Sequence, residues 1–258
     1  MSVPSPIPAA TLVLFRETEG QAPELLIVER AEQMSFAAGA LVFPGGRVDP
    51  GDHAIAADST LVSGAEAIDA EDAAARVAAI RETIEESGLA VGIYPLPDAA
   101  ATEALRATIH AGGDFAAVLR DGGWRIDLDA LVPFARWCPN FRETRSFDTR
   151  FYVARLPAGA PEAQVDATEN VRLFWAPAQA VLDMADRGEA RIIFPTRRNL
   201  ERLALFADFE AARDHAAAIP VQLIQPWVEE RDGAAMLCIP EGLGYPVTFQ
   251  PMTEVRRG

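Results

Sequence analysis

The stretch Arg81-Glu82-Thr83-Ile84-Glu85-Glu86-Ser87-Gly88-Leu89 closes a segment, residues 72–87, whose apolar spacing predicts a helix. Asp69 or Asp72 can cap the start of this helix. Gly88 stands where a left-handed residue often ends one. The stretch therefore places a run of acidic residues on the last two turns of a helix.

Glu82, Glu85 and Glu86 share one face of this helix, because residues three and four apart are neighbours. Crowded carboxylates repel one another, and a hard divalent cation such as Mg²⁺ is bound by carboxylate oxygens and would relieve that repulsion. Arg81, four residues before Glu85, is placed to orient or neutralise part of the cluster. The alternative is an ordinary solvated surface helix, which a glutamate pair alone would favour.

A glycine-rich segment upstream favours the metal site over the solvated face. It reads Phe43-Pro44-Gly45-Gly46-Arg47-Val48-Asp49-Pro50-Gly51-Asp52. Paired glycines leave backbone amides open and let a loop approach an anion or a metal closely. A glycine-rich loop leading to an acidic helix is the arrangement expected of a metal-bridged phosphate site.

Gly46, Asp52 and the Arg81–Leu89 stretch together resemble the sequence box of the Nudix hydrolases. The second half, Arg-Glu-x-x-Glu-Glu-x-Gly followed by an aliphatic residue, matches at every defined position. The first half departs twice: Asp52 stands where glutamate is usual, and residues 53–80 replace a much shorter spacer. The resemblance thus implies an insertion inside the box.

The resemblance implies an α/β/α sandwich with a mixed sheet, and an enzyme that hydrolyses nucleoside diphosphate derivatives with Mg²⁺ or Mn²⁺. By matching positions, it implies that Glu85 and Glu86 are metal ligands and that Glu82 is a ligand or the catalytic base. It also implies that Gly46 offers a carbonyl to the metal and that Arg81 orients a glutamate.

A base must take a proton from the attacking water, and an acid from a later loop is the alternative to a helix glutamate. Glu169 is our candidate for that acid, with Glu162 and Asp166 as rivals and a plain solvated glutamate as the alternative interpretation.

Within the family, the segment from Arg30-Ala31 through Gly39 to the glycine pair is similar to the motif of the coenzyme A and acyl-CoA diphosphatases. Ser35 stands in place of that motif's second arginine. The insertion in the box and the segment Arg145-Ser-Phe-Asp-Thr-Arg-Phe-Tyr152 point to the same branch. We therefore expect coenzyme A or an acyl-CoA as substrate, with ADP-ribose or a dinucleotide as the alternative.

Four residues are candidate substrate contacts. Arginine forks match phosphate oxygens, glycine amides can approach them, and an aromatic side chain can stack on a base. The candidates are Arg30, Gly45, Phe36 and Arg145. Arg30 has a plain alternative as the exposed end of a strand, Phe36 as a packing anchor and Arg145 as part of a salt-bridged edge strand.

The remaining pattern predicts a single α/β domain over residues 1–258. Apolar runs predict strands at residues 10–15, 25–30, 41–43, 147–154 and 171–175, and helices at 178–187 and 196–213. We expect insertions at about 53–72 and 95–124, and a C-terminal appendage at about 219–258 that could close a final hairpin.

Composition excludes several other classes of protein. The chain has 258 residues and a net charge of −15, which argues against nucleic-acid binding by bulk charge. Cys138 and Cys238 are too few for a zinc cluster and read as reduced core thiols. No signal peptide or membrane-spanning run is found, so we expect a cytoplasmic location.

Serine-hydrolase, P-loop and dinucleotide-binding motifs are not found in the sequence. The family resemblance adds a homodimer as the candidate oligomeric state. The alternative to an enzyme is a non-catalytic nucleotide-binding module of the same fold. Three clustered carboxylates argue against it, because a module freed from catalysis has no need of them.

Overall fold

A mixed eight-stranded sheet forms the centre of the computed structural model, which describes residues 5–33, 37–139, 146–166 and 169–255. Its strands are β1 (Ile7–Arg16), β2 (Glu24–Arg30), β3 (Leu41–Val42), β4 (Gly45–Arg47), β8 (Val132–Trp137), β9 (Phe147–Arg155), β10 (Asn170–Pro177) and β11 (Leu223–Ile224). The order is β10-β2-β1-β9-β8-β11, with β3 beside β2 and β4 beside β1. β1 runs parallel to β9 and antiparallel to β2 and β4, which makes the sheet mixed.

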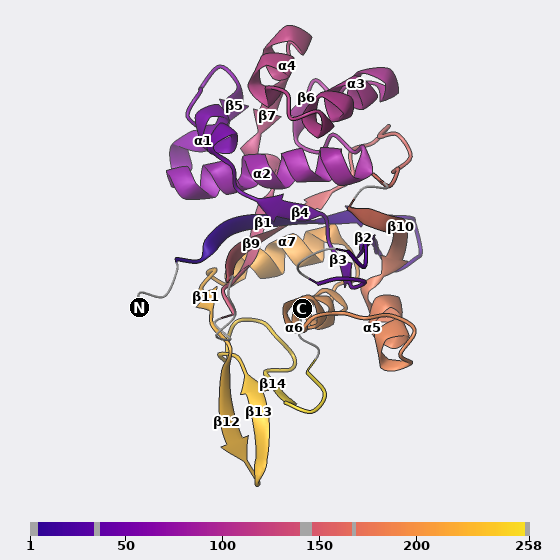
Figure 1. Cartoon of the computed structure of the whole chain (residues 1–258), viewed down its shortest axis with the longest axis vertical. Coiled ribbons are helices and arrows are strands. Elements are labelled where there is room, and N and C mark those ends of the chain that lie inside the picture. The colour runs from indigo at the N-terminus through magenta and orange to yellow at the C-terminus, as the bar shows by residue number, and fades with distance from the viewer. Residues whose placement is uncertain (1–4, 34–36, 140–145, 167–168, 256–258) are drawn as a thin grey trace.

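Helices cover both faces of this sheet (Figure 1). On one side lie α1 (Pro50–Ala56), α2 (Ala70–Ser87), α3 (Ala99–His110) and α4 (Phe115–Gly122). On the other lie α5 (Ala178–Asp186), α6 (Phe194–Leu203) and α7 (Phe209–Ala218). The predicted α/β/α sandwich with a mixed sheet is confirmed.

Alternation along the strands divides the core in two, because successive strand residues point to opposite faces. In β1, Leu12 and Leu14 pack beneath α2, whereas Val13 and Phe15 belong to the cluster under α5, α6 and α7. All four are at most 1% exposed. The sheet is therefore buried on both faces and gives α2 a rigid base.

The three regions that we expected to lie outside the common core are folded, and each contributes residues to one of the two core clusters. Residues 53–72 include the end of α1, β5 (Val62–Ser63) and the short helix η1 (Ala65–Ala67). Residues 95–124 form α3 and α4, and β5 joins β6 (Ile93–Tyr94) and β7 (Arg125–Asp127) in a small sheet; the short helix η2 (Leu128–Ala130) follows β7. That these regions are insertions stays a prediction.

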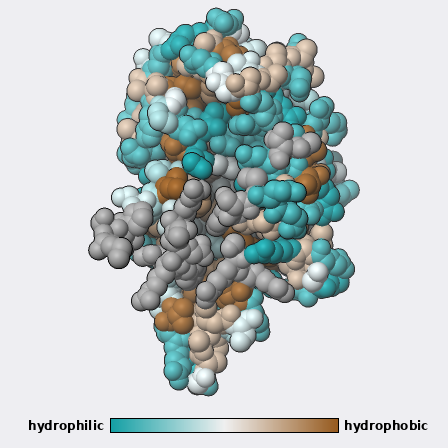
Figure 2. Space-filling view, viewed as in Figure 1, coloured by the Kyte–Doolittle hydropathy of each residue, from teal (hydrophilic) through white to brown (hydrophobic). Residues whose placement is uncertain are grey.

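The C-terminal region holds a hairpin within a three-stranded sheet of β12 (Trp227–Arg231), β13 (Ala234–Cys238) and β14 (Phe249–Pro251). Asp232 and Gly233, both at positive φ, make its turn. The sheet projects from the body of the molecule (Figure 1), and Figure 2 shows its exposed apolar residues as small patches among hydrophilic ones.

The single helix expected at 196–213 is wrong, because the chain forms two helices there. Asp208 adopts an extended conformation at φ −160°, and its carboxylate accepts a hydrogen bond from the Ala211 amide at 2.7 Å. That cap starts α7 and separates it from α6.

Cys138 and Cys238 are both buried free thiols, as expected. Among the described residues, no helix combines the length and the apolar character needed to cross a membrane.

Candidate metal and diphosphate site

Helix α2 packs on β1 and β4 and carries the acidic residues to the glycine pair of β4. The Asp69 carboxylate accepts a hydrogen bond from the Asp72 amide at 2.8 Å and starts the helix. Gly88, at φ +68°, ends it. Between them five of the twelve buried residues of α2 are alanines, which let the helix lie close to the sheet. The last two turns consequently hold the glutamates against the glycine pair of β4.

Glu82 lies directly over Gly46. A Cβ atom on Gly46 would overlap the Glu82 carboxyl group, so a larger residue here would displace that carboxyl group from its present position. Arg81 donates a 2.7 Å hydrogen bond to Glu82 Oε1. Burial raises the pKa of Glu82 to about 7, because loss of water outweighs the attraction of Arg81.

Glu86 is the most deeply buried of the three, at 3% exposure. Its Oε2 accepts a 3.2 Å hydrogen bond from the Gly45 amide, and the Asn170 side chain donates another. Burial, with the nearby charge of Glu82, raises the pKa of Glu86 well above its usual value. The positive charge of Arg30 only partly offsets this effect.

Glu85 lies at the more open side of the same turn. Its oxygens are 3.8 Å from Arg81 Nη1 and 3.5 Å from His110 Nδ1. Burial raises the pKa of Glu85 above its usual value, and the charges of Glu169 and Asp166 raise it further. The loop that carries these two acids thus lies close to Glu85.

Arg81 and Asp52 form the ion pair that holds the loop to the helix. Two guanidinium nitrogens of Arg81 donate to the two oxygens of Asp52, each at 2.9 Å, and a third bond goes to the Arg47 carbonyl. Asp52 also accepts from the Asp49 amide at 2.8 Å. The two ends of the segment 53–80 are therefore held together by this ion pair. The glycine turn stays beside the helix although the spacer is long.

The donor set fits a divalent cation. Glu82, Glu85 and Glu86 all have raised pKa values because burial and mutual repulsion leave their charge poorly compensated. A cation would supply that compensation, and Mg²⁺ needs only one or two carboxylates because it keeps several waters. Within the described ranges, no three His, Cys, Asp or Glu side chains are already gathered as a ligand set.

The other predicted site residues fall in three places. Arg30 Nη2 lies 3.7 Å from Glu169 Oε2, so the structure brings these two together beside Glu86. Gly45 is at the site, although its amide is engaged by Glu86. Phe36 and Arg145 lie outside the described residues.

The two rivals of Glu169 lie on the same loop. Asp166 accepts hydrogen bonds from the amides of Glu169 and Asn170, at 3.0 and 3.4 Å, and so shapes the loop end. Glu162 is exposed further back on the loop.

Two site residues on α3 were not predicted from the sequence. His110 faces Glu85, with 3.5 Å between its Nδ1 and Glu85 Oε1. Arg106 donates to the Glu85 carbonyl and to the Gln164 carbonyl, both at 2.9 Å, and joins α2 to the acidic loop. Their spacing of four on one helix face was the only available signal, and nothing in it indicates which neighbour that face meets.

Alanine substitutions of Gly46 and Gly45 are expected to affect different properties, activity in the first case and stability in the second. At Gly46 the added methyl meets only the flexible end of Glu82, so Gly46→Ala should displace this carboxylate and lower activity with little loss of stability. At Gly45 the methyl meets backbone atoms of Ala10 and Thr11, so Gly45→Ala should lower the free energy of unfolding. Urea unfolding and hydrolysis rates of both variants check this. Equal effects of the two variants on stability would contradict it.

Comparison with known proteins places this geometry in a family. No family model matches the chain. The chain is similar to the crystal structure of a Nudix hydrolase from Alicyclobacillus acidocaldarius, with 30% identity, a TM-score of 0.72, and coverage of 83% of this chain and 97% of that one.

Two further solved structures are more distant. The Nudix domain of Shewanella oneidensis NrtR complexed with ADP ribose has 14% identity and a TM-score of 0.42, covering 77% of this chain and 86% of that one. A C. elegans Ap4A hydrolase binary complex has 18% identity and a TM-score of 0.38, covering 71% of this chain and 88% of that one. The identity and coverage shared with the Alicyclobacillus enzyme, over a chain that carries the acidic helix beside a glycine pair, show that this protein belongs to the Nudix hydrolase family.

Proposed function

We propose that the protein hydrolyses the diphosphate linkage of a nucleoside diphosphate derivative with Mg²⁺ or Mn²⁺, and that coenzyme A or an acyl-CoA is its substrate. The observation that carries the reaction is the group of Glu82, Glu85 and Glu86, whose raised pKa values mark negative charge in need of a cation. The coenzyme A assignment is supported by the Arg30-to-Gly46 segment and the 145–152 segment of the sequence.

The three glutamates and the Gly46 carbonyl would hold the cation. When bound, the cation neutralises and polarises the phosphate oxygens of the substrate. Without it, the acidic surface of a protein of net charge −15 would repel a diphosphate. Arg81, held by Asp52, fixes the position of Glu82.

Arg30 is placed to hold a substrate phosphate. Its side chain is 15% exposed, and its Nε is buried with no hydrogen-bond partner among the described residues. A guanidinium matches phosphate oxygens and carries its charge at all working pH values. Glu169, 3.7 Å from Arg30 and half exposed, is our candidate for the base that accepts the proton of the attacking water.

A panel of diphosphates tests the activity directly. Purified protein with Mg²⁺ is incubated with coenzyme A, an acyl-CoA, ADP-ribose and a dinucleotide, and the products are identified by mass. We expect coenzyme A and the acyl-CoA to be cleaved into two phosphate monoesters. If only ADP-ribose or the dinucleotide is cleaved, the coenzyme A assignment fails. If no compound is cleaved, a nucleotide-binding module is the better account.

Metal binding is expected to stabilise the folded protein. Mg²⁺ or Mn²⁺ binds the native site and not the unfolded chain, so the melting temperature should rise with metal concentration. Differential scanning calorimetry of the wild type and of Glu85→Gln, with and without metal, measures this. The shift should shrink in the variant. A shift of equal size in both proteins would place the metal elsewhere.

A further inference from the structure

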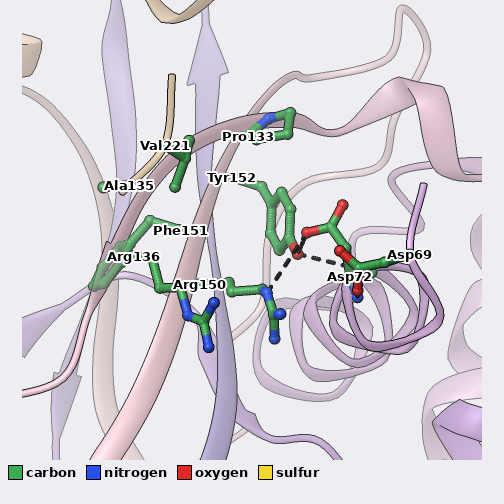
Figure 3. A pocket seen from close by; sticks show the side chains of 9 residues that line it. All are labelled: Asp69, Asp72, Pro133, Ala135, Arg136, Arg150, Phe151, Tyr152 and Val221. Atoms are coloured by element: carbon green, nitrogen blue, oxygen red, sulfur yellow. Dashed lines mark hydrogen bonds and ion pairs between the residues drawn. The ribbon is translucent and has the colours of Figure 1, made fainter. Parts of the chain in front are cut away.

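A second pocket lies at the opposite end of α2 from the glutamates. It is formed by the start of α2, by β8 and β9, and by the segment before β11 (Figure 3). The lining residues that matter here are Asp69, Asp72, Arg136, Arg150, Tyr152 and Val221. Since a helix rises about 1.5 Å per residue, Asp72 and Glu82 are roughly 15 Å apart along α2. The pocket is therefore separate from the metal site.

Arg150 is the side chain in this pocket that lacks a close partner. It is 14% exposed, and its nearest acid is Asp72, with Nε 3.7 Å from Oδ1. Asp72 is already occupied, because it accepts a 2.7 Å bond from the Tyr152 hydroxyl and pairs with Arg76 at 2.9 Å. In the part of the chain that the structure describes, the terminal nitrogens of Arg150 donate no hydrogen bond. A mostly buried guanidinium in this state is costly unless water or a ligand meets it.

Arg136 adds a second positive charge beside it. Arg136 and Arg150 are register partners on the antiparallel strands β8 and β9, and their guanidinium groups point to the same side of the pocket (Figure 3). Like charges directly opposite on neighbouring strands destabilise a sheet. Asp148 neutralises Arg136 through two bonds of 2.8 and 2.6 Å, so the less well compensated charge is that of Arg150, whose ion pair with Asp72 spans 3.7 Å.

The acids of the pocket do not cancel this charge. Asp72 is matched by Arg76 and Asp148 by Arg136. Asp69 stands exposed at the rim, where it caps α2 and where water screens its charge. The inner wall therefore presents the two terminal nitrogens of Arg150, which donate no hydrogen bond among the described residues, and the remaining donor nitrogen of Arg136.

We propose that this pocket binds a phosphate group, either as inorganic phosphate or as the end of a phosphate monoester. A guanidinium fork pairs with phosphate through two parallel hydrogen bonds, and Arg136 can add a third donor. The pocket encloses about 170 Å³, below the roughly 300 Å³ at which sites for whole drug-sized ligands begin, so it suits the phosphate group rather than an entire nucleotide. The proposal does not depend on the hydrolytic activity.

Isothermal titration calorimetry with inorganic phosphate, in EDTA and at low salt, tests this proposal. The wild type and Glu86→Gln should bind phosphate equally, because neither the metal nor the acidic helix takes part. Arg150→Gln should weaken binding at least about tenfold, since it removes a charge-assisted pair. Arg120→Gln, which changes an exposed arginine of α4, is the matched control and should bind as the wild type does.

Val221→Trp is the second variant, because it fills the pocket from its far wall without touching the charges. It should weaken binding at least as strongly as Arg150→Gln does, and melting temperatures of both variants confirm that they are folded. Titration with adenosine monophosphate and with acetate separates the sources: the monoester binds if its phosphate end is accepted, and acetate does not compete. Binding as tight as that of the wild type in folded Arg150→Gln or Val221→Trp overturns the proposal, as does absence of binding to the wild type or equally tight binding of acetate.

Discussion

Glu86→Gln is expected to lower turnover by about a hundredfold to a thousandfold or more, while the melting temperature stays the same or rises. The loss of activity has the size seen when one charge-stabilising group is removed from an active site. Glutamine keeps the shape of the side chain, and its carbonyl can still accept the bond from the Gly45 amide, now 3.2 Å long. It removes only the charge that we assign to the metal.

The expected sign of the stability change follows from the raised pKa of Glu86. Burial raises this pKa well above the value that the group has in the unfolded chain. The folded state then binds a proton that the unfolded state has released, so stability falls as the pH rises through the window above the ordinary carboxyl pKa. A neutral glutamine avoids this loss at pH 7 in metal-free protein.

Glu71→Gln is the matched control, since Glu71 is an exposed acid in the first turn of the same helix. It should leave turnover and melting temperature unchanged. Hydrolysis kinetics and calorimetry of both variants check the prediction. A large loss of stability in Glu86→Gln would show a structural residue instead of a metal ligand.

Asp52→Asn is expected to lower the free energy of unfolding by about 3–5 kcal/mol, the usual cost of removing one partner of a buried ion pair. The Asp52 side chain is 2% exposed and that of Arg81 is 12% exposed, so water cannot replace the lost charge. Although burial acts to lower it, the hydrogen bonds of Asp52 and the charge of Glu82 hold the pKa of Arg81 above its usual value. The arginine would stay charged and would keep its bond to Glu82, but it would lose the paired carboxylate that holds it to the loop.

A double-mutant cycle separates the pair from its surroundings. Arg81→Met combined with Asp52→Asn should cost less than the sum of the single changes, because the second change removes the stranded charge. Asp49→Asn is the control: Asp49 is 61% exposed and 3.7 Å from Arg81, so little change is expected. Urea unfolding of these four variants and of the wild type measures the free energies of unfolding. Additive costs would mean that the ion pair does not hold the loop to the helix.

Local pattern predicted the elements that position the site. The helix expected at 72–87 spans Ala70–Ser87, and the strand expected at 10–15 spans Ile7–Arg16. Both segments have strong apolar periodicity and clear end residues. These signals depend only on neighbouring residues in the sequence. β8 (Val132–Trp137) was not predicted, because Pro133 normally argues against a strand; the structure accommodates it at a register shift between Pro133 and Ala135.

Long-range contacts could not be predicted in the same way. The Arg81–Asp52 pair joins residues 29 apart, and the His110–Glu85 contact joins two helices through the packing of α3 on α2. Composition of the 95–124 region gives no indication of where its helices dock. The acidic helix and the glycine pair could therefore be predicted from the sequence. The residues that contact and hold them could be identified only from the packing in the structure.

The claim that Glu82, Glu85 and Glu86 hold the cation is tested most directly by a crystal grown with Mn²⁺ and a methylene-bridged diphosphate that cannot be hydrolysed. The account predicts an anomalous manganese peak at coordination distance, about 2.0–2.3 Å, from oxygens of at least two of these glutamates and from a phosphate oxygen. A fully occupied ligand with no manganese at these side chains, or with manganese bound only elsewhere, would contradict it.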